Sequence, residues 1–537
     1  MKKHENIAFR KCLFGTMVLL CCVGFTFAQV QTAGSSGDDF LSATDVAADG
    51  AVYAAGTYGA AFQLGGQTLA NSGGADFLLL KTDSDGTLQW SAFGGSFLDE
   101  EAADVAAHPQ GGVVCAGAFW FTAQFGNLSL QAVQNPKALF LIRYTSEGQP
   151  HWGRAIDGGA LKEARSMAIA GDGSIFLTGF FQGQLIFGTD TTLVANGETD
   201  FFLAKFTASG QLLWALNCGG QRDTRGVALA IDHASGDVVA TGFYNKEAQF
   251  GSQTLVANTS DKDVFVARFN TQGQVLWARR AGGVHDDQVS GVAIDGQGDI
   301  YLTGYFIGVI NLAEGFSIQS QNGIPDFYLI RYAPDGTPLL ARSMGSALQE
   351  QSSDIVVHGE AIVVSGYFEG NLNIDGASIS AGTGFRGFLA TFSTELLLYH
   401  LTAISGTGNN TVSALAANNS GQLWLAGSFR NTIQLNANTY VATAASDGFL
   451  ARFDQVVSTN KPLPQGAILV FPNPTGDTCF LKTPWTEYDV ILFDTAGRQV
   501  FRKKNAQELL LGNYPSGQYT LVVRSREGQA LRKIIVP

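Results

Sequence analysis

Short apolar runs separated by turn-forming residues cover most of the chain, and one such run recurs along it. It is a hydrophobic strand that ends in Thr, Ala or Ser, then Gly, as in DDQVSGVAIDGQGDIYLTGYF from Asp286 to Phe306. The intervals between successive copies are 61, 62, 63, 62, 62 and 61 residues. Seven copies at so constant a period predict a repeat architecture. The repeat glycines are Gly56, Gly117, Gly179, Gly242, Gly304, Gly366 and Gly427.

Each complete copy contains four strand-like runs, of which two pairs are joined by short connections rich in turn formers. A four-stranded antiparallel unit cannot cover both of its own faces, so the units have to stack on one another. Seven units around an axis predict an all-β fold, a seven-bladed β-propeller with about 62 residues per blade. In the fourth copy the predicted strands are Arg225–Ile231, Asp237–Tyr244, Asp263–Phe269 and Gln274–Arg280.

The two ends of the repeat region predict how the ring closes. The seventh copy ends at Phe453 without a fourth strand. The segment Val30–Asp39 aligns without a gap on Ala278–Asp287, where a fourth strand ends and the next copy begins. We therefore expect the amino-terminal strand to complete the last blade, because this closure removes the exposed edges of an open array.

A tryptophan recurs at one position of the fourth strand in four copies. Large aromatic residues at an equivalent repeat position are more often packing residues than a ligand cage. We interpret them as residues that pack between neighbouring blades. They are Trp90, Trp152, Trp214 and Trp277.

Changes in composition divide the chain into four parts. Residues 1–28 have a basic start, an apolar run and a small residue for cleavage, which predicts a secretory signal peptide and no transmembrane segment in the mature chain. Residues 29–453 form the predicted propeller. Residues 454–466 contain two prolines and small polar residues, which predicts a linker. Residues 467–537 lack the repeat, and their short alternating strands predict a small β-sandwich.

Charge and composition narrow the classes of partner and cofactor. The net charge of -13 provides no basic field for phosphates, so we expect no nucleic-acid partner. Cys115, Cys218 and Cys479 follow the signal peptide without CxxC spacing, and we interpret them as buried small apolar residues. The seven histidines show no metal-ligand spacing. The sequence therefore predicts neither a metal site nor a cofactor.

The carboxyl-terminal part carries short motifs in a fixed order: FPNP from Phe471, DTAGR from Asp494, YPSGQY from Tyr514 and RKIIV from Arg532. Together they resemble the C-terminal sorting domain of the type IX secretion system of Bacteroidetes. The resemblance implies passage through the periplasm and across the outer membrane, with the secretion machinery as partner. It also implies release from the cell or attachment to surface lipopolysaccharide. By this resemblance, the sorting signal includes Pro472, Asn473, Pro474, Asp494, Gly497, Arg498, Gly517, Tyr519 and Lys533.

The repeats themselves contain phrases such as GDIYLTGYF and DVFVARFNTQGQVLWARRAGG. These phrases are similar to the bacterial β-propeller repeats of the SBBP type. The similarity extends over residues 29–453 and is weaker in the sixth copy. It implies the propeller fold and assigns no activity to particular residues, since a fold does not confer function.

Candidate binding residues lie in the loops that connect one predicted blade to the next. These loops share one face of the propeller with the long segments between second and third strands. Their charges would converge on the central mouth and form a site for a polar ligand or a cation; alternatively, they are solvated loops at equivalent positions. The candidates are Asp38, Asp39, Asp99, Glu100, Arg165, Arg222, Asp223, Arg225, Asp286 and Asp287.

Two functions remain open at this point. The first is a secreted or cell-surface, non-catalytic protein whose propeller is a platform for adhesion or for binding a glycan or a protein. The second is a secreted polysaccharide hydrolase or lyase with an acidic site at the mouth. The sequence contains no nucleophile elbow, and we assign no catalytic residue. The sixth copy departs from the repeat mainly with the apolar residues Leu396–Leu398, which favours the first function.

Overall fold

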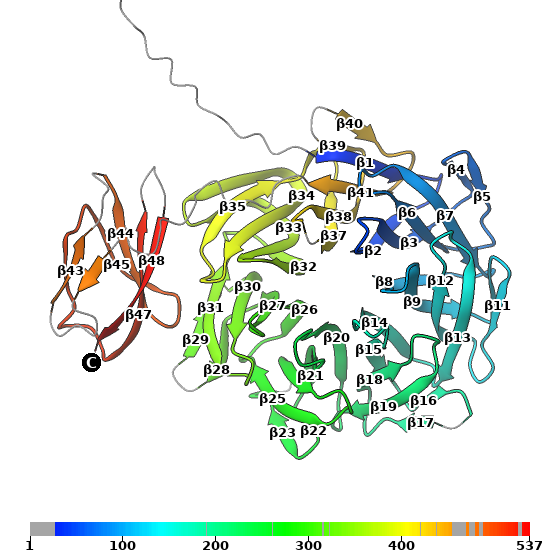
Figure 1. The fold of residues 1–537 in the computed structure, drawn as a ribbon, viewed down its shortest axis with the longest axis horizontal. Coiled ribbons are helices and arrows are strands. Elements are labelled where there is room, and N and C mark those ends of the chain that lie inside the picture. Colours follow the sequence, from blue (N-terminus) through cyan, green and yellow to red (C-terminus); the bar gives the residue numbers. More distant parts are fainter. Residues whose placement is uncertain are drawn as a thin grey trace, which may run out of the picture.

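The computed structural model shows strands arranged around a central axis, with a smaller group of strands beside them (Figure 1). The predicted signal peptide up to residue 26, the predicted linker, and Pro472, Asn473 and Pro474 lie outside the described residues. Within the described residues, no helix is long and apolar enough to span a membrane. The structure describes residues 27–189, 191–259, 261–313, 316–321, 323–418, 420–435, 438–453, 469–471, 478–482, 487–524 and 529–536.

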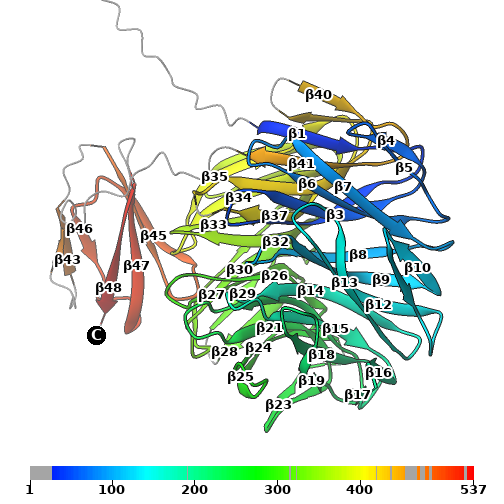
Figure 2. The same cartoon turned by 45° about the vertical axis from the view of Figure 1, so that its right-hand side comes forward.

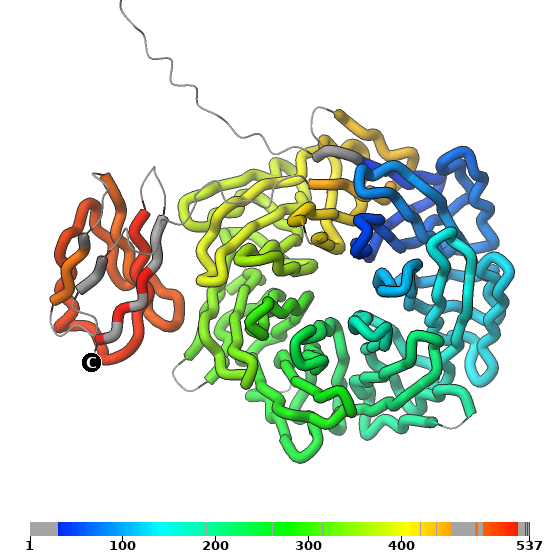
Figure 3. The backbone as a smooth tube through the Cα atoms, in the orientation of Figure 1, coloured from blue at the N-terminus to red at the C-terminus, as the bar shows by residue number. Residues whose placement is uncertain are grey.

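The ring consists of groups of four neighbouring antiparallel strands, which we call blades 1 to 7 (Figures 1 and 3). In blades 1 to 6 the chain runs from the innermost strand outward. Blades 1 to 4 contain, in this order, β2 (Phe40–Val46), β3 (Val52–Tyr58), β6 (Asp76–Thr82) and β7 (Leu88–Gly95); β8 (Glu101–Ala107), β9 (Val113–Trp120), β12 (Lys137–Tyr144) and β13 (Pro150–Gly158); β14 (Lys162–Ile169), β15 (Ile175–Phe181), β18 (Asp200–Phe206) and β19 (Leu212–Cys218); β20 (Thr224–Ile231), β21 (Val238–Asn245), β24 (Lys262–Phe269) and β25 (Val275–Ala281).

Blades 5 to 7 follow the same order, and the seventh takes its outermost strand from the other end of the described chain. They contain β26 (Asp287–Ile294), β27 (Ile300–Phe306), β30 (Asp326–Tyr332) and β31 (Pro338–Met344); β32 (Glu350–His358), β33 (Ala361–Ile374), β34 (Ala377–Ser393) and β35 (Leu398–Ala403); β37 (Asn410–Ala417), β38 (Leu423–Phe429), β41 (Asp447–Phe453) and β1 (Phe27–Ala33).

Strand β1 is the outermost strand of blade 7 and pairs with β41 (Figure 1). The two strands are antiparallel, with Val30 opposite Ala451 and Ala33 opposite Gly448. Beyond this ladder, the amide of Asp39 donates a hydrogen bond of 2.8 Å to the carbonyl of Ser446. The first and last strands of the propeller region therefore share one sheet.

The repeat glycine is required by a close approach between the first and second strands of a blade. A Cβ on Gly56 would lie 1.8 Å from the carbonyl oxygen of Phe40, and one on Gly117 would lie 1.9 Å from that of Glu101. At this point every innermost strand contains a register shift, such as the one between Leu41 and Ala43. An inserted residue bends a strand locally, and the small glycine opposite accommodates the bend.

The recurring tryptophans pack between blades, as the sequence predicts. A Cβ on Gly148, in a turn of the following blade, would lie 2.7 Å from the indole ring of Trp90. The Trp90 indole N–H donates a 2.8 Å hydrogen bond to the carbonyl of Ser146 in that turn. Trp214 makes the equivalent bond, at 3.2 Å, to Thr271. Each indole therefore connects its own blade to the next.

Small outer hairpins add further pairing between blades. Strands β10 (Thr122–Phe125) and β11 (Leu128–Gln131) form the hairpin of blade 2, and β10 pairs with β7 of blade 1. The pair β16 (Gln184–Phe187) and β17 (Thr191–Val194) extends the sheet of blade 2 in the same way. The other hairpins are β4 (Phe62–Leu64) with β5 (Gln67–Leu69), β22 (Glu247–Phe250) with β23 (Gln253–Val256), β28 (Val309–Ala313) with β29 (Phe316–Gln319), and β39 (Thr432–Leu435) with β40 (Asn438–Val441), where β36 (Ser405–Gly406) pairs with β39.

The carboxyl-terminal strands form two sheets around a common apolar core. One sheet has the order β42 (Leu469–Phe471), β43 (Thr478–Lys482), β46 (Glu508–Leu510), and the other β45 (Gln499–Lys504), β44 (Asp489–Phe493), β47 (Gly517–Arg524), β48 (Gln529–Val536). Both views place them beside the ring (Figures 1 and 2). On the outer face of the second sheet, Ile491 and Val522 pack against Leu397 of the sixth blade.

Candidate functional site

Seven equivalent residues lie where a blade-to-blade loop meets the next innermost strand, and all are buried. Three of them, Asp39, Glu100 and Asp287, belong to the residues that the sequence suggests for the mouth. The structure places them between neighbouring blades, where Asp39 and Asp287 are 0% exposed and Glu100 is 2% exposed. The complete set is Asp39, Glu100, Lys162, Thr224, Asp287, Glu350 and Asn410.

The buried acids close the loops that precede them. Glu100 accepts the amide of Ser96 at Oε2, at 2.8 Å, and the hydroxyl of the same residue at Oε1, at 2.7 Å. Glu350 binds the amide and the hydroxyl of Ser346 in the same way. Short side chains often satisfy nearby backbone donors in turns, and here the acid four residues later does so. These carboxylates therefore hold the loops in place. The same pattern recurs in Ser35 and Asp39.

A second buried carboxylate faces Glu100 from the preceding blade. Asp76 begins β6, and its Oδ2 accepts the amide of Ser72 at 2.6 Å. A Cβ on Gly95 would lie 2.1 Å from Oδ1 of Asp76 and 2.9 Å from Oε2 of Glu100. Burial raises the pKa of Asp76 to about 6 and that of Glu100 to about 7. Two carboxyls so close in a buried site are stable together when they share a proton.

Paired acids recur at three further junctions. Between blades 5 and 6, burial raises the pKa of Asp326 to about 6 and that of Glu350 to about 7. Between blades 4 and 5, burial raises the pKa of Asp287 to about 8, and the neighbouring charge of Asp263 raises it as well. The Nε of Arg280 donates to Asp263 at this junction. The fourth pair, Asp39 and Asp447, lies at the junction between blades 7 and 1.

The junction between blades 2 and 3 places its acid on a different strand. Ala138 takes the register position of Asp76, while Asp157 on β13 takes that of Gly95. The side chain of Asp157 still serves the loop between second and third strands, because its Oδ2 accepts the amide of Val133 at 2.6 Å. The loop keeps a carboxylate acceptor although the acid has moved to the neighbouring strand.

The residue that faces Asp157 from the next blade is basic, whereas the equivalent residue of the preceding junction is an acid. Lys162 replaces the acid found at Glu100, and its Nζ lies 3.9 Å from Oδ1 of Asp157. The ammonium also donates a 2.7 Å hydrogen bond to the carbonyl of Gly159. Burial lowers the pKa of Lys162 to about 8, and the charge of Asp157 opposes this shift. This junction therefore contains its own cation.

The remaining acidic candidates stay at the surface and cap neighbouring strands. Asp99 is exposed, and its Oδ1 accepts the amide of Ala75 at 2.8 Å. Asp286 is exposed, and it binds both the amide of Lys262, at 3.1 Å, and the ammonium of that residue, at 3.3 Å. Such carboxylates can reach a ligand. The other candidates that are not buried are Asp38, Arg165, Arg222, Asp223 and Arg225.

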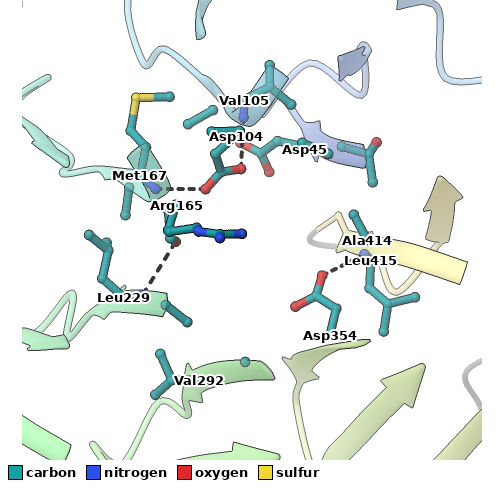
Figure 4. A pocket seen from close by; sticks show the side chains of 18 of the residues that line it. Asp45, Asp104, Val105, Arg165, Met167, Leu229, Val292, Asp354, Ala414 and Leu415 are labelled. Carbon is teal, nitrogen blue, oxygen red and sulfur yellow. Dashed lines mark hydrogen bonds between the residues drawn. The ribbon is translucent and has the colours of Figure 1, made fainter. Parts of the chain in front are cut away.

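The innermost strands surround a cavity of about 370 Å³ (Figure 4). Asp45, Asp104 and Asp354 line it, and each accepts a backbone amide from the next blade. Burial raises their pKa values to about 6, 7 and 6, respectively. These three acids therefore tie adjacent blades together at the cavity wall. The amides belong to Ala107, Met167 and Leu415, at 2.8, 2.7 and 2.7 Å.

Arg165 is the candidate that reaches the cavity. Its side chain extends into the open centre in Figure 4, from the register shift of β14. The guanidinium lies 2.5 Å from Oε2 of Glu163 and 5.6 Å from the ring centre of Phe180. Half of the Arg165 side chain remains exposed. The arginine is therefore available to a ligand that enters the mouth.

Arg225, a candidate from the sequence, lies against aromatic rings that the sequence candidates do not include. Its guanidinium lies 4.5 Å from the ring centre of Phe180 and 5.9 Å from that of Phe243. These rings follow the repeat glycine of blades 3 and 4, and Tyr305 and Tyr367 follow it in blades 5 and 6. We call these four rings the aromatic arc. Blades 7, 1 and 2 have small residues at this position, namely Ser428, Thr57 and Ala118. A comparison of the repeat copies in the sequence could have found this difference.

Four described residues of the sorting signal, Asp494, Gly497, Arg498 and Tyr519, take part in turns of the small domain. Asp494 Oδ1 accepts the amide of Arg498 at 3.0 Å, and Oδ2 accepts its Nε at 2.9 Å. Gly497 lies in this turn at φ 71°, a conformation that favours glycine. The hydroxyl of Tyr519 donates to the carbonyl of Pro515 at 2.8 Å. Gly517 and Lys533 lie on β47 and β48.

Two protein families match parts of this chain. Residues 469–537 match the secretion system C-terminal sorting domain, and residues 276–305 match the SBBP β-propeller repeat. An uncharacterized WD repeat-containing protein of Acanthamoeba polyphaga mimivirus is 23% identical over 485 residues, which cover 74% of this chain and 35% of that protein. The regulatory protein FlaEY of Caulobacter vibrioides is 24% identical over 343 residues, covering 59% of this chain and 35% of that protein. The chain thus spans about a third of these relatives.

Solved structures with a similar arrangement include the WD40 domain of Pan2 from Neurospora crassa. Its TM-score is 0.40 at 10% identity, covering 81% of this chain and 96% of that chain. The quinohemoprotein alcohol dehydrogenase of Comamonas testosteroni has a TM-score of 0.41 at 10% identity, covering 84% and 79%. Because both scores are below 0.5, the fold assignment depends on the sheet topology and the repeat match.

The ring of antiparallel blades and the terminal pair of sheets define a β-propeller protein with an export domain. Its propeller contains the SBBP-type repeat, and its terminal region is a type IX secretion sorting domain. The sorting domain directs the protein to the type IX machinery, and so to the cell surface or out of the cell.

Proposed function

We propose that this protein is a non-catalytic binding protein of the cell surface or the secreted fraction, and that the mouth of the propeller is its recognition face. The observation that carries this proposal is the set of half-buried rings of the aromatic arc, Phe243, Tyr305 and Tyr367, together with Arg165 and Arg225. The fourth ring, Phe180, is buried and lies against the two guanidiniums. When consecutive blades depart together from the repeat, the departure favours a binding site over a packing requirement. The ligand is a glycan or a protein, framed by the exposed loop residues of the mouth.

The alternative is a polysaccharide hydrolase or lyase, which needs an acid that reaches its substrate. The mouth-loop acids with raised pKa values, including Glu100 and Asp287, are buried in junctions. Glu100 binds Ser96, and Oδ2 of Asp287 binds the amide of Gly283 at 2.8 Å. This use of their oxygens supports the binding proposal over the enzymatic alternative.

The test compares the two halves of the mouth in the purified mature chain. We expect Tyr305→Ala combined with Tyr367→Ala to lower binding on a glycan array, or to a protein partner, at least tenfold without lowering the melting temperature. Thr57→Ala combined with Ser428→Ala is the matched control on the opposite half, and we expect it to bind normally. Polysaccharide turnover that Asp286→Asn and Asp287→Asn abolish would contradict the proposal and support an enzyme.

A further inference from the structure

A pair of phenylalanines stands out on the part of the mouth face that lies opposite the aromatic arc. Phe97 is in the loop from blade 1 to blade 2, and Phe121 follows the second strand of blade 2. The two residues are 62% and 42% exposed. The rings are stacked, with centres 5.2 Å apart and an angle of 23° between their planes. Large exposed aromatic surfaces on a folded domain indicate interaction sites.

The backbone at Phe121 adds a second, independent observation. Phe121 has φ 54°, in the left-handed region, which is unfavourable for a bulky side chain. The carbonyl of this residue accepts the amide that closes the outer hairpin, from Ala132 at 2.7 Å, and the equivalent residues of blades 3 to 7 also have positive φ. In four of these blades the residue is better suited to the conformation, namely Gly183, Gly308, Gly370 and Asn431, and in blade 4 it is Lys246. A strained residue that stability does not select is a candidate for function.

The surroundings of the pair indicate what kind of ligand fits. Lys137 and Glu101 neutralise each other, with Nζ 2.6 Å from Oε1. Asp99 is exposed and supplies carboxylate oxygens beside Phe97 in the same loop. Flat apolar rings beside the Asp99 carboxylate, with Lys137 already paired to Glu101, complement a ring with an apolar face and hydroxyl groups. An acidic polymer is disfavoured by these groups and by the net charge of -13.

We propose that Phe97 and Phe121 form a binding subsite for a pyranose ring of a neutral glycan, with the sugar stacked on the aromatic pair and its hydroxyls donating to Asp99. This inference rests on the proposed binding function and names one ligand class and one subsite for it. The subsite is separate from the aromatic arc, because it lies on blades 1 and 2.

The experiment uses the mature full-length chain and three probes: cellohexaose, laminarihexaose and mannohexaose. Affinities are measured by isothermal titration calorimetry for the wild type, Phe121→Gly and Phe97→Ala. We expect the wild type to bind at least one probe and each variant to bind that probe at least tenfold more weakly. Because glycine suits the left-handed backbone, we expect the melting temperature of Phe121→Gly to equal or exceed that of the wild type.

Lys246 provides the matched control, since it has φ 60° at the equivalent position of blade 4 and carries no aromatic ring. We expect Lys246→Gly to relieve the same strain and to leave glycan affinity unchanged. The subsite is refuted if the wild type binds none of the probes, or if both phenylalanine variants bind as the wild type does. A melting temperature several degrees lower in Phe121→Gly would mark a packing role instead. If only the arc variant, Tyr305→Ala with Tyr367→Ala, loses binding, the subsite is refuted and the proposed function stands. The same conclusion follows if a protein ligand binds both phenylalanine variants as tightly as it binds the wild type.

Discussion

The junction between blades 1 and 2 and the junction between blades 2 and 3 occupy equivalent places but use different charges. Both give the loop between second and third strands a carboxylate acceptor, from the third strand in one case and from the fourth in the other. The comparison teaches that the fold requires an acceptor at this point in space, and that either of two adjacent strands can supply it when the residue opposite is small. The residues compared are Asp76, Gly95 and Glu100 with Ala138, Asp157 and Lys162.

The same comparison shows two ways to compensate buried charge. The first junction brings two carboxyls together, and burial raises both pKa values. The second places an ammonium 3.9 Å from its acid, so the charges compensate each other. An uncompensated buried charge is strongly destabilising, and each junction avoids it with a proton or with a lysine.

The largest effect is expected when the second junction loses its acid. Asp157→Ala removes the acceptor of the Val133 amide and leaves Lys162 buried without a counter-charge. We expect the free energy of unfolding to fall by about 3 kcal/mol, as for broken buried ion pairs. Chemical denaturation of the full chain measures this change, with the exposed Asp286→Asn as control. An unchanged transition would show that the junctions do not depend on their acids.

A smaller effect is expected when the glycine of the first junction gains a side chain. Gly95→Ala would place a Cβ 2.1 Å from Oδ1 of Asp76, so the carboxylate has to move away from its loop. We expect a loss of about 2 kcal/mol, within the range for overpacked sites. Gly171→Ala is the control, since nothing lies within 4 Å of its added Cβ. Adding Asp76→Ala to Gly95→Ala should recover part of the loss, and failure to recover any would contradict the steric explanation.

The smallest effect is expected from pH, which changes the stability of the two junctions in opposite directions. In the folded chain, burial raises the pKa of Glu100 to about 7, above the ordinary value of 4.5, so between these values the folded state holds more protons than the unfolded state. Its stabilising contribution is therefore present at low pH and is lost as the pH rises through about 7. We expect unfolding free energies to be higher at pH 5 than at pH 8.

Glu100→Gln should reduce this pH dependence by about 1 kcal/mol, because one titrating group is removed. Its neighbour Glu101, whose side chain is half exposed, provides the control Glu101→Gln. Lys162 acts in the opposite direction: burial lowers its pKa to about 8, so its junction gains stability as the pH rises above that value. Identical pH slopes for the wild type and Glu100→Gln would contradict a shared proton at the first junction.

Sequence reasoning located the strands well where the signal is periodic. The predicted strand Asp263–Phe269 corresponds to β24, Lys262–Phe269, and Gln274–Arg280 to β25, Val275–Ala281. The tryptophans were recognised as packing residues because a large apolar ring at one position of several copies has to meet an equivalent surface in each. The turn of the next blade that each tryptophan contacts could not be predicted, because the contact depends on how neighbouring blades stack.

The candidate site shows the limit of the same reasoning. Asp38 and Asp39 are adjacent and chemically identical, yet Asp38 is exposed and Asp39 is buried between blades. Adjacent residues entering a strand point to opposite sides, and the sequence does not say which side faces another blade. The pair of Phe97 and Phe121 was missed for a related reason, since the two rings come together from different loops. The aromatic arc could have been found by comparing the residue after the repeat glycine in each copy.

The sequence by itself determined the repeat, the strand order within a blade and the export domain, because these depend on local pattern and short motifs. The tertiary structure alone decided which charged residues of the mouth loops are buried and which can meet a ligand. It also decided which acids share a junction, since each junction joins strands of two blades. Burial and pairing depend on distances between segments far apart in the chain, and no local pattern contains them.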